Sequence, residues 1–204
     1  MIKLLLVRHG KTYANELGLW SGQTESKMTQ QGIEGIYYLK EKLKEIRMDG
    51  IYSSPSTRTL ESVSILRSGM NVQNETIEKV EALKEIDFGK FEGKDFGWVQ
   101  KNEPSQIDKM MAEGNGYIYP QGESLVMQHQ RVSQWLNKWL ESHQEGTYLV
   151  CAHGGTIRCI LSELLSGNDS LHWHFKIDPA SLTVVTITEG YAVIEALNYS
   201  QNQV

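Results

Sequence analysis

The chain has 204 residues, 40% of them hydrophobic, which suits one α/β domain with a full core or a domain with a small cap. Its formal net charge of -5 argues against nucleic acid or an anionic membrane surface as the main partner, although an acidic protein can contain a cationic pocket. No apolar run approaches the ~20 residues of a membrane span and no signal-peptide pattern is present, so we expect a cytoplasmic protein.

The first predicted element is a strand over residues 2–7, an aliphatic run that is too short for an independent helix. Such a run is typical of a strand that is buried on both faces of a parallel sheet. It ends abruptly in Arg8, His9 and Gly10, at the strand end where open α/β sheets bind ligands. Taken alone, the segment is equally compatible with polar residues that only solvate the end of a strand.

A helix is predicted next, with Thr29 as its N-cap and apolar residues at helical spacing over residues 30–46. A short strand at residues 51–53 follows. Pro55 is placed to open a second helix, with Arg58 in its first turn. Strand and helix have then alternated twice, and we expect an α/β protein with three α/β/α layers and a mostly parallel central sheet.

Residues 84–122 interrupt this alternation. The segment is rich in glycine, charged and aromatic residues, and one short helix is predicted over residues 104–112. We interpret it as a small cap-like insertion of helix and loop over the mouth of the active site, within a single domain of residues 1–204. Its aromatic side chains could stack on a ring of a ligand or form a small core of their own.

The alternation then resumes up to the end of the chain. The predicted elements are a helix over residues 123–143, a strand over 148–152, a helix over 156–165 and two strands over 182–187 and 192–197. We expect His129 and His143 to be solvated on the polar side of the first of these helices. Cys151 and Cys159 lack metal-ligand or redox spacing, and we interpret both as small core residues.

The strand at residues 148–152 has the same design as the first strand, because it runs directly into His153 and Gly154. The glycine after each of the two histidines allows the backbone to approach a ligand closely. If the strands are parallel neighbours, their carboxyl ends bring together Arg8, His9, Arg58 and His153. A cluster of this charge favours an anionic ligand.

Five segments of the chain closely resemble the pattern of the histidine phosphatase superfamily, also called phosphoglycerate mutase-like. They are Leu6-Val7-Arg8-His9-Gly10-Lys11-Thr12 with Asn15, Ser53-Ser54-Pro55-Ser56-Thr57-Arg58 with Ser62, Leu83-Lys84-Glu85-Ile86-Asp87-Phe88-Gly89 through Glu92-Gly93, Pro120-Gln121-Gly122-Glu123-Ser124, and His153-Gly154-Gly155 with Ile157-Arg158. Each is weak alone, but their order and spacing agree with the family across the chain. Lys11, Thr59 and Asp178 depart from the family pattern without removing a catalytic group, and Lys11 changes the charge that a substrate meets.

The resemblance implies a phosphomonoester hydrolase that acts through a phosphohistidine on small phosphorylated metabolites. It assigns the nucleophile to His9, and a neutral imidazole suits this role near pH 7. It assigns to Glu85 the proton that the leaving oxygen needs, with Asp87 as the rival acid of the same motif. Desolvation would favour a protonated Glu85 and the neighbouring cations would oppose it, so the sequence leaves its protonation open.

The resemblance also implies which residues bind the substrate. Arg8, Arg58 and His153 would hold the phosphate, because each arginine offers a planar donor fork and a protonated His153 donates as well. Four further residues are expected, from their positions in the motifs, to contact the substrate: Asn15, Gly22, Gln23 and Gly154. The alternative is a turn-forming role for Asn15 and loop packing for Gly22 and Gln23.

The segments at residues 88–93 and 120–124 look most like those of bacterial broad-specificity phosphatases and alpha-ribazole phosphatases, which makes alpha-ribazole 5'-phosphate one substrate hypothesis. The alternatives are a phosphoglycerate mutase-type phosphoryl transferase and a non-catalytic module that binds a phosphorylated ligand. Mutases of this family carry Arg-His-Tyr where this chain has Ile86-Asp87-Phe88, and no catalytic group is missing. We therefore favour hydrolysis.

We expect no cofactor and no metal, because side chains supply the positive charge and no carboxylate cluster of magnesium-ligand type accompanies them. His172 and His174 flank Trp173 and would share one face of a strand, where they could bind a metal, but a third ligand is not evident. The expected partner is a small phosphomonoester, with neither nucleic acid nor membrane, and the sequence leaves the oligomeric state open.

Overall fold

The structure is a computed structural model that describes residues 1–72 and 76–201. The predicted domain of residues 1–204 also includes 73–75 and 202–204, which lie outside the described residues. The central sheet contains β1 (Ile2–Arg8), β3 (Gly50–Ser53), β5 (Ile77–Lys79), β6 (Gly146–Ala152), β7 (Leu182–Thr188) and β8 (Tyr191–Tyr199). Their order is β5-β3-β6-β1-β7-β8, and β7 pairs antiparallel with its neighbours while the other pairs are parallel. The prediction of a mostly parallel sheet is confirmed.

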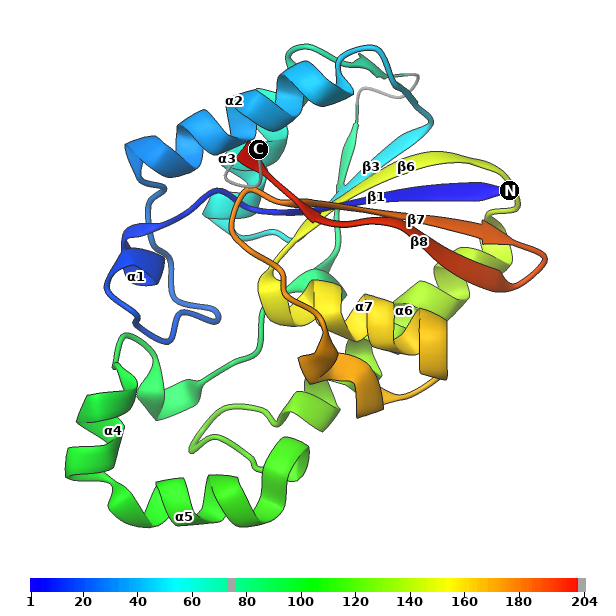
Figure 1. The fold of residues 1–204 in the computed structure, drawn as a ribbon. Coiled ribbons are helices and arrows are strands. Elements are labelled where there is room, and N and C mark those ends of the chain that lie inside the picture. Colours follow the sequence, from blue (N-terminus) through cyan, green and yellow to red (C-terminus); the bar gives the residue numbers. More distant parts are fainter. Residues whose placement is uncertain (73–75, 202–204) are drawn as a thin grey trace.

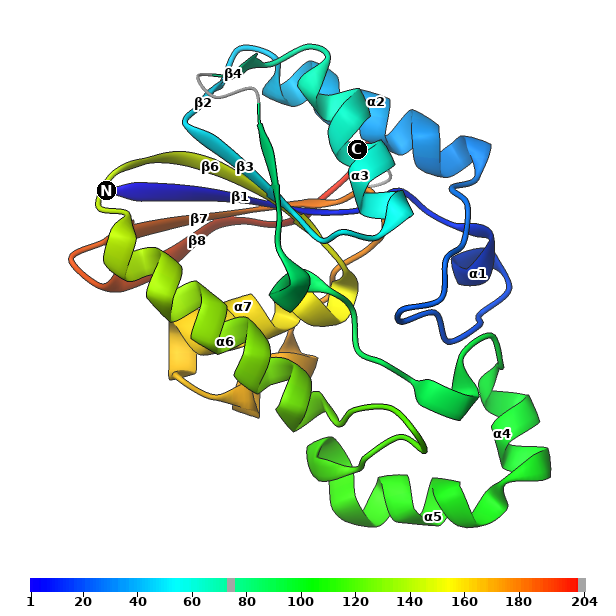
Figure 2. The same cartoon turned by 180° about the vertical axis from the view of Figure 1, so that it is seen from behind.

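Helices cover both faces of this sheet (Figures 1 and 2). One face carries α2 (Gln30–Leu43) and α3 (Thr57–Arg67), and the other carries α6 (Leu125–Ser142) and α7 (Gly154–Ser166). Successive side chains of a strand point to opposite faces, so β1 contributes to two cores. Leu5 and Val7 pack into the core beneath α2 and α3, whereas Leu4 and Leu6 pack into the core beneath α6 and α7. The three α/β/α layers are therefore as predicted.

The segment between β5 and α6 leaves these layers. Figures 1 and 2 show α4 (Phe96–Asn102) and α5 (Pro104–Glu113) at a distance from the sheet, on the side of α6 and α7. Short 3-10 helices η1 (Glu81–Leu83), η2 (Gly89–Phe91) and η3 (Gly114–Gly116) connect them to the rest. α5 agrees with the helix predicted over 104–112. α4 was not predicted, because it has only seven residues and buries only Val99, so it shows no helical periodicity.

The remaining elements are short. α1 (Tyr13–Glu16) follows β1, a separate parallel pair is formed by β2 (Arg47–Met48) and β4 (Asn71–Val72), and η4 (Asp169–His174) follows α7. The prediction that His172 and His174 share one face of a strand is wrong. Both residues lie in the 3-10 helix η4, where His172 is buried and His174 is exposed. No helix within the described ranges is long and apolar enough to cross a membrane.

Candidate active site

His9 and His153 directly follow the adjacent parallel strands β1 and β6. The register pairs Arg8 with Ala152, so the next residue of each strand lies at the same edge of the sheet. The centroids of the two imidazole rings are 5.2 Å apart, and both side chains are buried. The structure thus brings together the two His-Gly segments that lie 144 residues apart in the sequence (153 minus 9).

The imidazole of His9 is oriented by its own loop. Its Nδ1 lies 2.8 Å from the carbonyl oxygen of Gly10. Because a carbonyl oxygen can only accept, Nδ1 carries the proton and Nε2 carries the free electron pair. Burial, reinforced by the guanidinium groups of Arg8 and Arg58, lowers the pKa of His9 well below its ordinary value. His9 is therefore neutral near pH 7, with a nucleophilic Nε2.

His153 is also neutral. Burial, followed by the guanidinium charges of Arg58 and Arg8, lowers its pKa well below the ordinary value. The expectation that His153 is protonated is therefore wrong for the protein without ligand, because the motif does not reveal how deeply the ring is buried. Its Nε2 lies 2.8 Å from the hydroxyl of Ser54, and its buried Nδ1 has no hydrogen-bond partner among the described residues. If the Ser54 hydroxyl donates to Nε2, Nδ1 carries a proton that a ligand could accept.

Arg8 is a buried cation at the end of β1. Its Nη1 donates to the carbonyl of Ile177 at 2.7 Å, while its buried Nε has no hydrogen-bond partner among the described residues. Burial lowers the pKa of Arg8 to about 10, so the guanidinium remains charged at neutral pH. A Cβ at Gly154 would lie 3.3 Å from the Arg8 Cζ, a tight contact, so the backbone at Gly154 lies close to this guanidinium. A buried charge with an unsatisfied donor is suited to an anionic ligand.

Arg58 enters the site from the first turn of α3. Its guanidinium is almost fully buried and donates to two backbone carbonyls, those of Thr24 and Gly22. The same turn is tied to the first motif, because the Ser62 hydroxyl donates to the Arg58 carbonyl and accepts from the Gly10 N–H at 3.1 Å. The charge of Arg58 therefore acts on His9 and His153, whose pKa values it lowers, while two of its donors hold the loop at residues 22–24.

That loop is held from its other side by a carboxylate. The backbone N–H groups of Gly22 and Gln23 donate to Glu92 at 3.1 and 3.0 Å. Neither residue lines the main cavity of the site, whereas the preceding residues Trp20 and Ser21 do. His9, Arg58 and His153 do not line this cavity either. Gly22 is buried and Gln23 is exposed, and their expected contact with the substrate stays a prediction.

Asn15 has the turn-forming role considered for it, and its contact with a substrate stays a prediction. It closes a capping box on α1, in which its Oδ1 accepts from the Thr12 N–H at 3.1 Å and its N–H donates to the Thr12 hydroxyl at 3.3 Å. It also lines the main cavity. The turn role occupies the side-chain oxygen and leaves the amide nitrogen available to a ligand.

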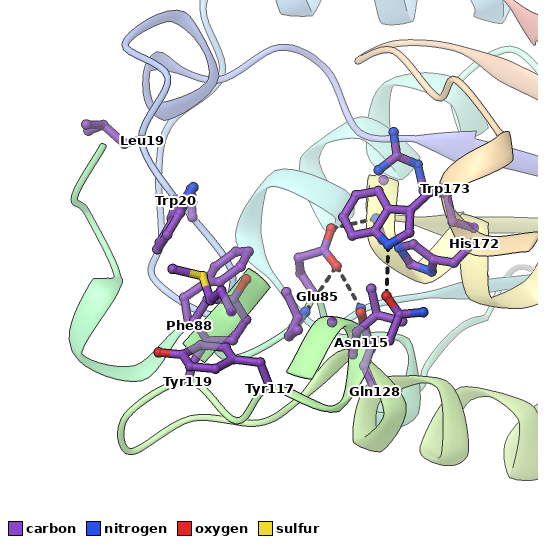
Figure 3. Close-up of a pocket in the computed structure, with 18 of the residues that line it drawn as sticks. Leu19, Trp20, Glu85, Phe88, Asn115, Tyr117, Tyr119, Gln128, His172 and Trp173 are labelled. Atoms are coloured by element: carbon purple, nitrogen blue, oxygen red, sulfur yellow. Dashed lines mark hydrogen bonds between the residues drawn. The ribbon is translucent and has the colours of Figure 1, made fainter. Parts of the chain in front are cut away.

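Glu85 projects into the cavity from the segment after η1, as Figure 3 shows. Its Oε2 accepts from the Gly155 N–H at 2.9 Å, and its Oε1 accepts from Gln128 Nε2 at 2.7 Å and from the Ile86 N–H at 3.0 Å. The rival acid Asp87 is not among the cavity-lining residues, since its Oδ1 accepts from the Gly89 N–H at 2.8 Å within a turn. Of the two carboxyl groups, only Glu85 faces the cavity.

Arg131 on α6 holds the backbone of the Glu85 segment. Its guanidinium donates to the carbonyl oxygens of Ala82, Lys84 and Glu85 and forms a bidentate ion pair with Glu123. Sequence reasoning missed both Gln128 and Arg131. A signal was present, because these residues stand three apart, and therefore on one face, in a helix that follows the segment Pro120-Gln121-Gly122-Glu123-Ser124.

The cavity itself measures about 390 Å³ and lies between the amino end of α7 and the insertion. One wall is aromatic, and Figure 3 shows Trp20, Phe88, Tyr117 and Tyr119 gathered on one side of Glu85. These rings pack on one another, with centroids 5.6 Å apart for Trp20 and Phe88 and 4.9 Å apart for Phe88 and Tyr119. Burial raises the pKa of Tyr119 to about 12. The rings therefore form a small core of the insertion as well as a wall of the cavity.

The opposite wall contains Arg158, His172 and Trp173. Burial is the main cause that lowers the pKa of His172 to about 4, so this side chain is neutral at physiological pH. Its Nδ1 contacts the Cys159 sulfur at 3.7 Å. No group of three or more potential metal ligands occurs within residues 1–72 and 76–201.

His129 on α6 and the half-buried His143, which caps the end of α6, are not simply solvated as expected. His129 is buried, and its Nε2 lies 3.0 Å from a carboxylate oxygen of Glu163 on α7. His143 stacks on Trp139 with centroids 4.2 Å apart, and its Nε2 lies 3.1 Å from the Tyr52 hydroxyl. The polar side of the helix predicted from sequence is covered by neighbouring elements, which the helical pattern alone does not reveal.

Comparison with known proteins points to one family. A family model for the histidine phosphatase superfamily (branch 1) matches residues 4–200. Phosphoserine phosphatase 1 of Hydrogenobacter thermophilus is 29% identical over 198 residues, which are 97% of this chain and 92% of that protein. The adenosylcobalamin/alpha-ribazole phosphatase of Escherichia coli (strain K12) is 24% identical over 197 residues, 97% of this chain and 96% of that protein. The crystal structure of the alpha-ribazole phosphatase from Shigella flexneri has the same fold, with a TM-score of 0.89 at 23% identity over 97% of this chain and 96% of that chain.

Proposed function

This chain belongs to the histidine phosphatase superfamily, and from that premise we propose that it hydrolyses small phosphomonoesters through a phosphohistidine on His9. The observation that carries the proposal is the state of His9. It is neutral, its Nδ1 is fixed on the Gly10 carbonyl, and its Nε2 electron pair is free. The charged guanidinium of Arg8, with its unpartnered Nε, stands at the end of the same strand. A nucleophile beside an anion site is what phosphoryl transfer to a protein requires.

A phosphomonoester resists attack because its oxygens repel a nucleophile and its alkoxide is a poor leaving group. In the proposed complex, Arg8 Nε and His153 Nδ1 donate to nonbridging phosphate oxygens, which would satisfy two of the buried polar atoms that have no partner among the described residues. Arg58 adds a second guanidinium charge. The amide of Asn15 and the backbone at Gly154 complete the expected phosphate contacts.

The reaction then proceeds in two steps. His9 Nε2 attacks phosphorus, the bond from phosphorus to the ester oxygen breaks, and a protonated Glu85 gives its proton to the departing alcohol. In the second step the Glu85 carboxylate takes a proton from a water molecule whose oxygen attacks the phosphohistidine. Inorganic phosphate leaves, and both His9 and Glu85 return to their starting states. Side chains supply all of the charge in this scheme, so it requires no metal ion.

The segment over residues 84–122 acts as a cap in this proposal, within one domain. Its aromatic wall, together with relatives that are named alpha-ribazole phosphatases, supports alpha-ribazole 5'-phosphate as one substrate to test, because aromatic side chains stack on rings. A relative that is named phosphoserine phosphatase supports O-phosphoserine as another.

The test is phosphate release from p-nitrophenyl phosphate, O-phosphoserine, alpha-ribazole 5'-phosphate and 3-phosphoglycerate, by the unmodified protein and by a His9→Ala variant. Release that depends on His9 supports hydrolysis, and a natural substrate should show a far higher kcat/KM than the generic ester. Conversion of 3-phosphoglycerate to its 2-phospho isomer without release would indicate a mutase instead. A folded protein that releases phosphate from none of them would overturn the proposal.

A further inference from the structure

Arg158 is a cation of the cavity wall to which the proposed reaction gives no role. Its Nε donates to the carbonyl of Phe175 at 2.9 Å, and its Cζ lies 5.4 Å from the centroid of the Trp173 ring. Within the described part of the chain, Arg158 forms no ion pair, and neither of its Nη atoms has an acceptor. The guanidinium is thus held in place from two sides while its outer pair of donors is unused.

The other charged groups of the cavity form no ion pair with Arg158 in the part of the chain that the structure describes. The lining contains only two further charged side chains, Arg8 and Glu85. Glu85 accepts from Gly155, Gln128 and Ile86, and Arg8 belongs to the proposed phosphate site. His172 beside Arg158 is neutral, because its pKa is about 4. Once Arg8 and Arg58 face the phosphate, the positive charge of Arg158 remains without a counterion.

The position of Arg158 relative to the phosphate site follows from helix geometry. Gly154, whose Cβ would touch the Arg8 guanidinium, and Arg158 stand four residues apart on α7. Residues at this spacing lie on the same face of a helix, about 6 Å apart. A group bound by Arg158 would therefore lie one helical turn from the phosphate, which is the separation available within a small leaving group.

We propose that Arg158 binds a carboxylate on the leaving group, so that the preferred substrates are phosphomonoesters of small hydroxy acids. The inference rests on the proposed hydrolysis at His9 and names the substrate class of that site. Because Nε is occupied by Phe175, the two Nη atoms present a planar pair of donors, which matches the two oxygens of a carboxylate.

The insertion helps to position Arg158. Trp173, whose ring faces the guanidinium, donates from Nε1 to Asn115 Oδ1 at 2.9 Å, and Asn115 Nδ2 donates to Asp169 at 2.9 Å. Figure 3 shows Asn115 and Trp173 joined by this hydrogen bond beside Glu85. Asn115 lies in η3, so the insertion fixes the ring that restricts the arginine. Trp173 and Asn115 are positioning residues in this account.

The test uses pairs of substrates that differ by one carboxylate: O-phosphoserine against O-phosphoethanolamine, and 3-phosphoglycerate against glycerol 3-phosphate. For the unmodified protein we expect kcat/KM to be roughly 10- to 100-fold higher for the acid of each pair, the range of a hydrogen bond between charged groups. An Arg158→Met variant should bring each ratio to within about threefold of one, because the donor pair is lost. Arg47→Met, which removes an exposed arginine on β2, is the matched control and should keep the ratio.

The outcomes separate this inference from the proposed function. Equal kcat/KM values for the two members of each pair would overturn the inference even if p-nitrophenyl phosphate is hydrolysed, and this comparison needs no variant. A clear preference for alpha-ribazole 5'-phosphate over both acids would also overturn it. An Arg158→Met variant that stays folded by circular dichroism and loses activity equally on all substrates would show a structural role. Failure of the folded, unmodified protein on p-nitrophenyl phosphate would instead count against hydrolysis itself.

Discussion

The carboxylate of Glu85 accepts a hydrogen bond from the backbone N–H of Gly155 at 2.9 Å. This contact joins the segment after η1 to the first turn of α7, where the unpaired N–H groups of a helix favour negative charge. α7 also begins directly after His153, so the proposed acid and the proposed phosphate site share one helix end. The backbone N–H of Gly155 therefore holds the Glu85 carboxylate beside the proposed phosphate site.

Replacing Glu85 by glutamine should lower kcat by roughly 10²- to 10⁴-fold, because the leaving oxygen would receive no proton and the attacking water would have no base. Binding of inorganic phosphate, measured by competitive inhibition, should change little. Asp87→Asn serves as the comparison, since Asp87 is engaged with the Gly89 N–H away from the cavity, and its effect on kcat should be much smaller. Full activity of the Glu85→Gln variant would assign the acid to another group.

The Gly155→Ala variant tests whether the position of Glu85 matters. A Cβ at residue 155 would overlap Glu85 Oε1, and the carboxylate can move aside because it is the end of a flexible side chain. We expect the variant to remain folded and kcat to fall about tenfold, with a smaller change in KM, because a displaced acid transfers its proton less efficiently. Unchanged kcat, with a melting temperature close to that of the parent, would show that the hydrogen bond to Gly155 is dispensable.

Arg131 should contribute to both stability and turnover. Arg131→Met removes one donor from each of three backbone carbonyls and from the partly buried Glu123. Of these acceptors, only the Lys84 carbonyl and Glu123 have a second donor among the described residues, from Thr156 and from the Asp87 N–H. We expect the free energy of unfolding, from urea titration, to fall by about 2–4 kcal/mol, the range for breaking a buried, hydrogen-bonded ion pair. The kcat of the folded variant should fall as well, since the Glu85 segment loses its anchor. A loss of stability below about 0.5 kcal/mol, as for a surface ion pair, would contradict this role.

The pH dependence follows from the neutral state of His9. Its active form is deprotonated, and burial lowers its pKa below the ordinary value, so activity should persist as the pH falls through the range in which an exposed histidine becomes protonated. The acid limb of kcat/KM, corrected for ionisation of the substrate, reports groups of the free enzyme and should lie below about pH 6. An acid limb near the ordinary histidine value of about 6.5 would indicate that His9 is not desolvated.

The sequence identified the parts of the fold and site that depend on short local patterns. The runs at residues 2–7 and 148–152 indicated buried parallel strands, and the residues that follow them indicated a cationic site at one sheet edge. Thr29 marked the start of α2 correctly, because its side chain accepts from the Gly32 N–H. Each of these features is encoded within a few neighbouring residues.

What the sequence did not reveal depends on contacts between distant segments. The neutral state of His153 and the burial of His129 follow from surrounding elements that no local pattern describes. Gln128 and Arg131 act on Glu85 and its segment from more than forty residues away. The edge strand β5 was missed for a different reason: it has only three residues, which is too short a run to give a strand pattern.

The most direct test of the account is the covalent intermediate on His9. The unmodified protein and a folded His9→Ala variant would be mixed with an aryl phosphate in excess EDTA, quenched without acid to preserve phosphohistidine, and analysed by intact-protein mass. We predict a transient mass increase of one phosphoryl group together with phosphate release for the unmodified protein, and neither for His9→Ala. Phosphate release without an adduct, release that requires added magnesium, or an adduct that persists in His9→Ala would contradict the mechanism.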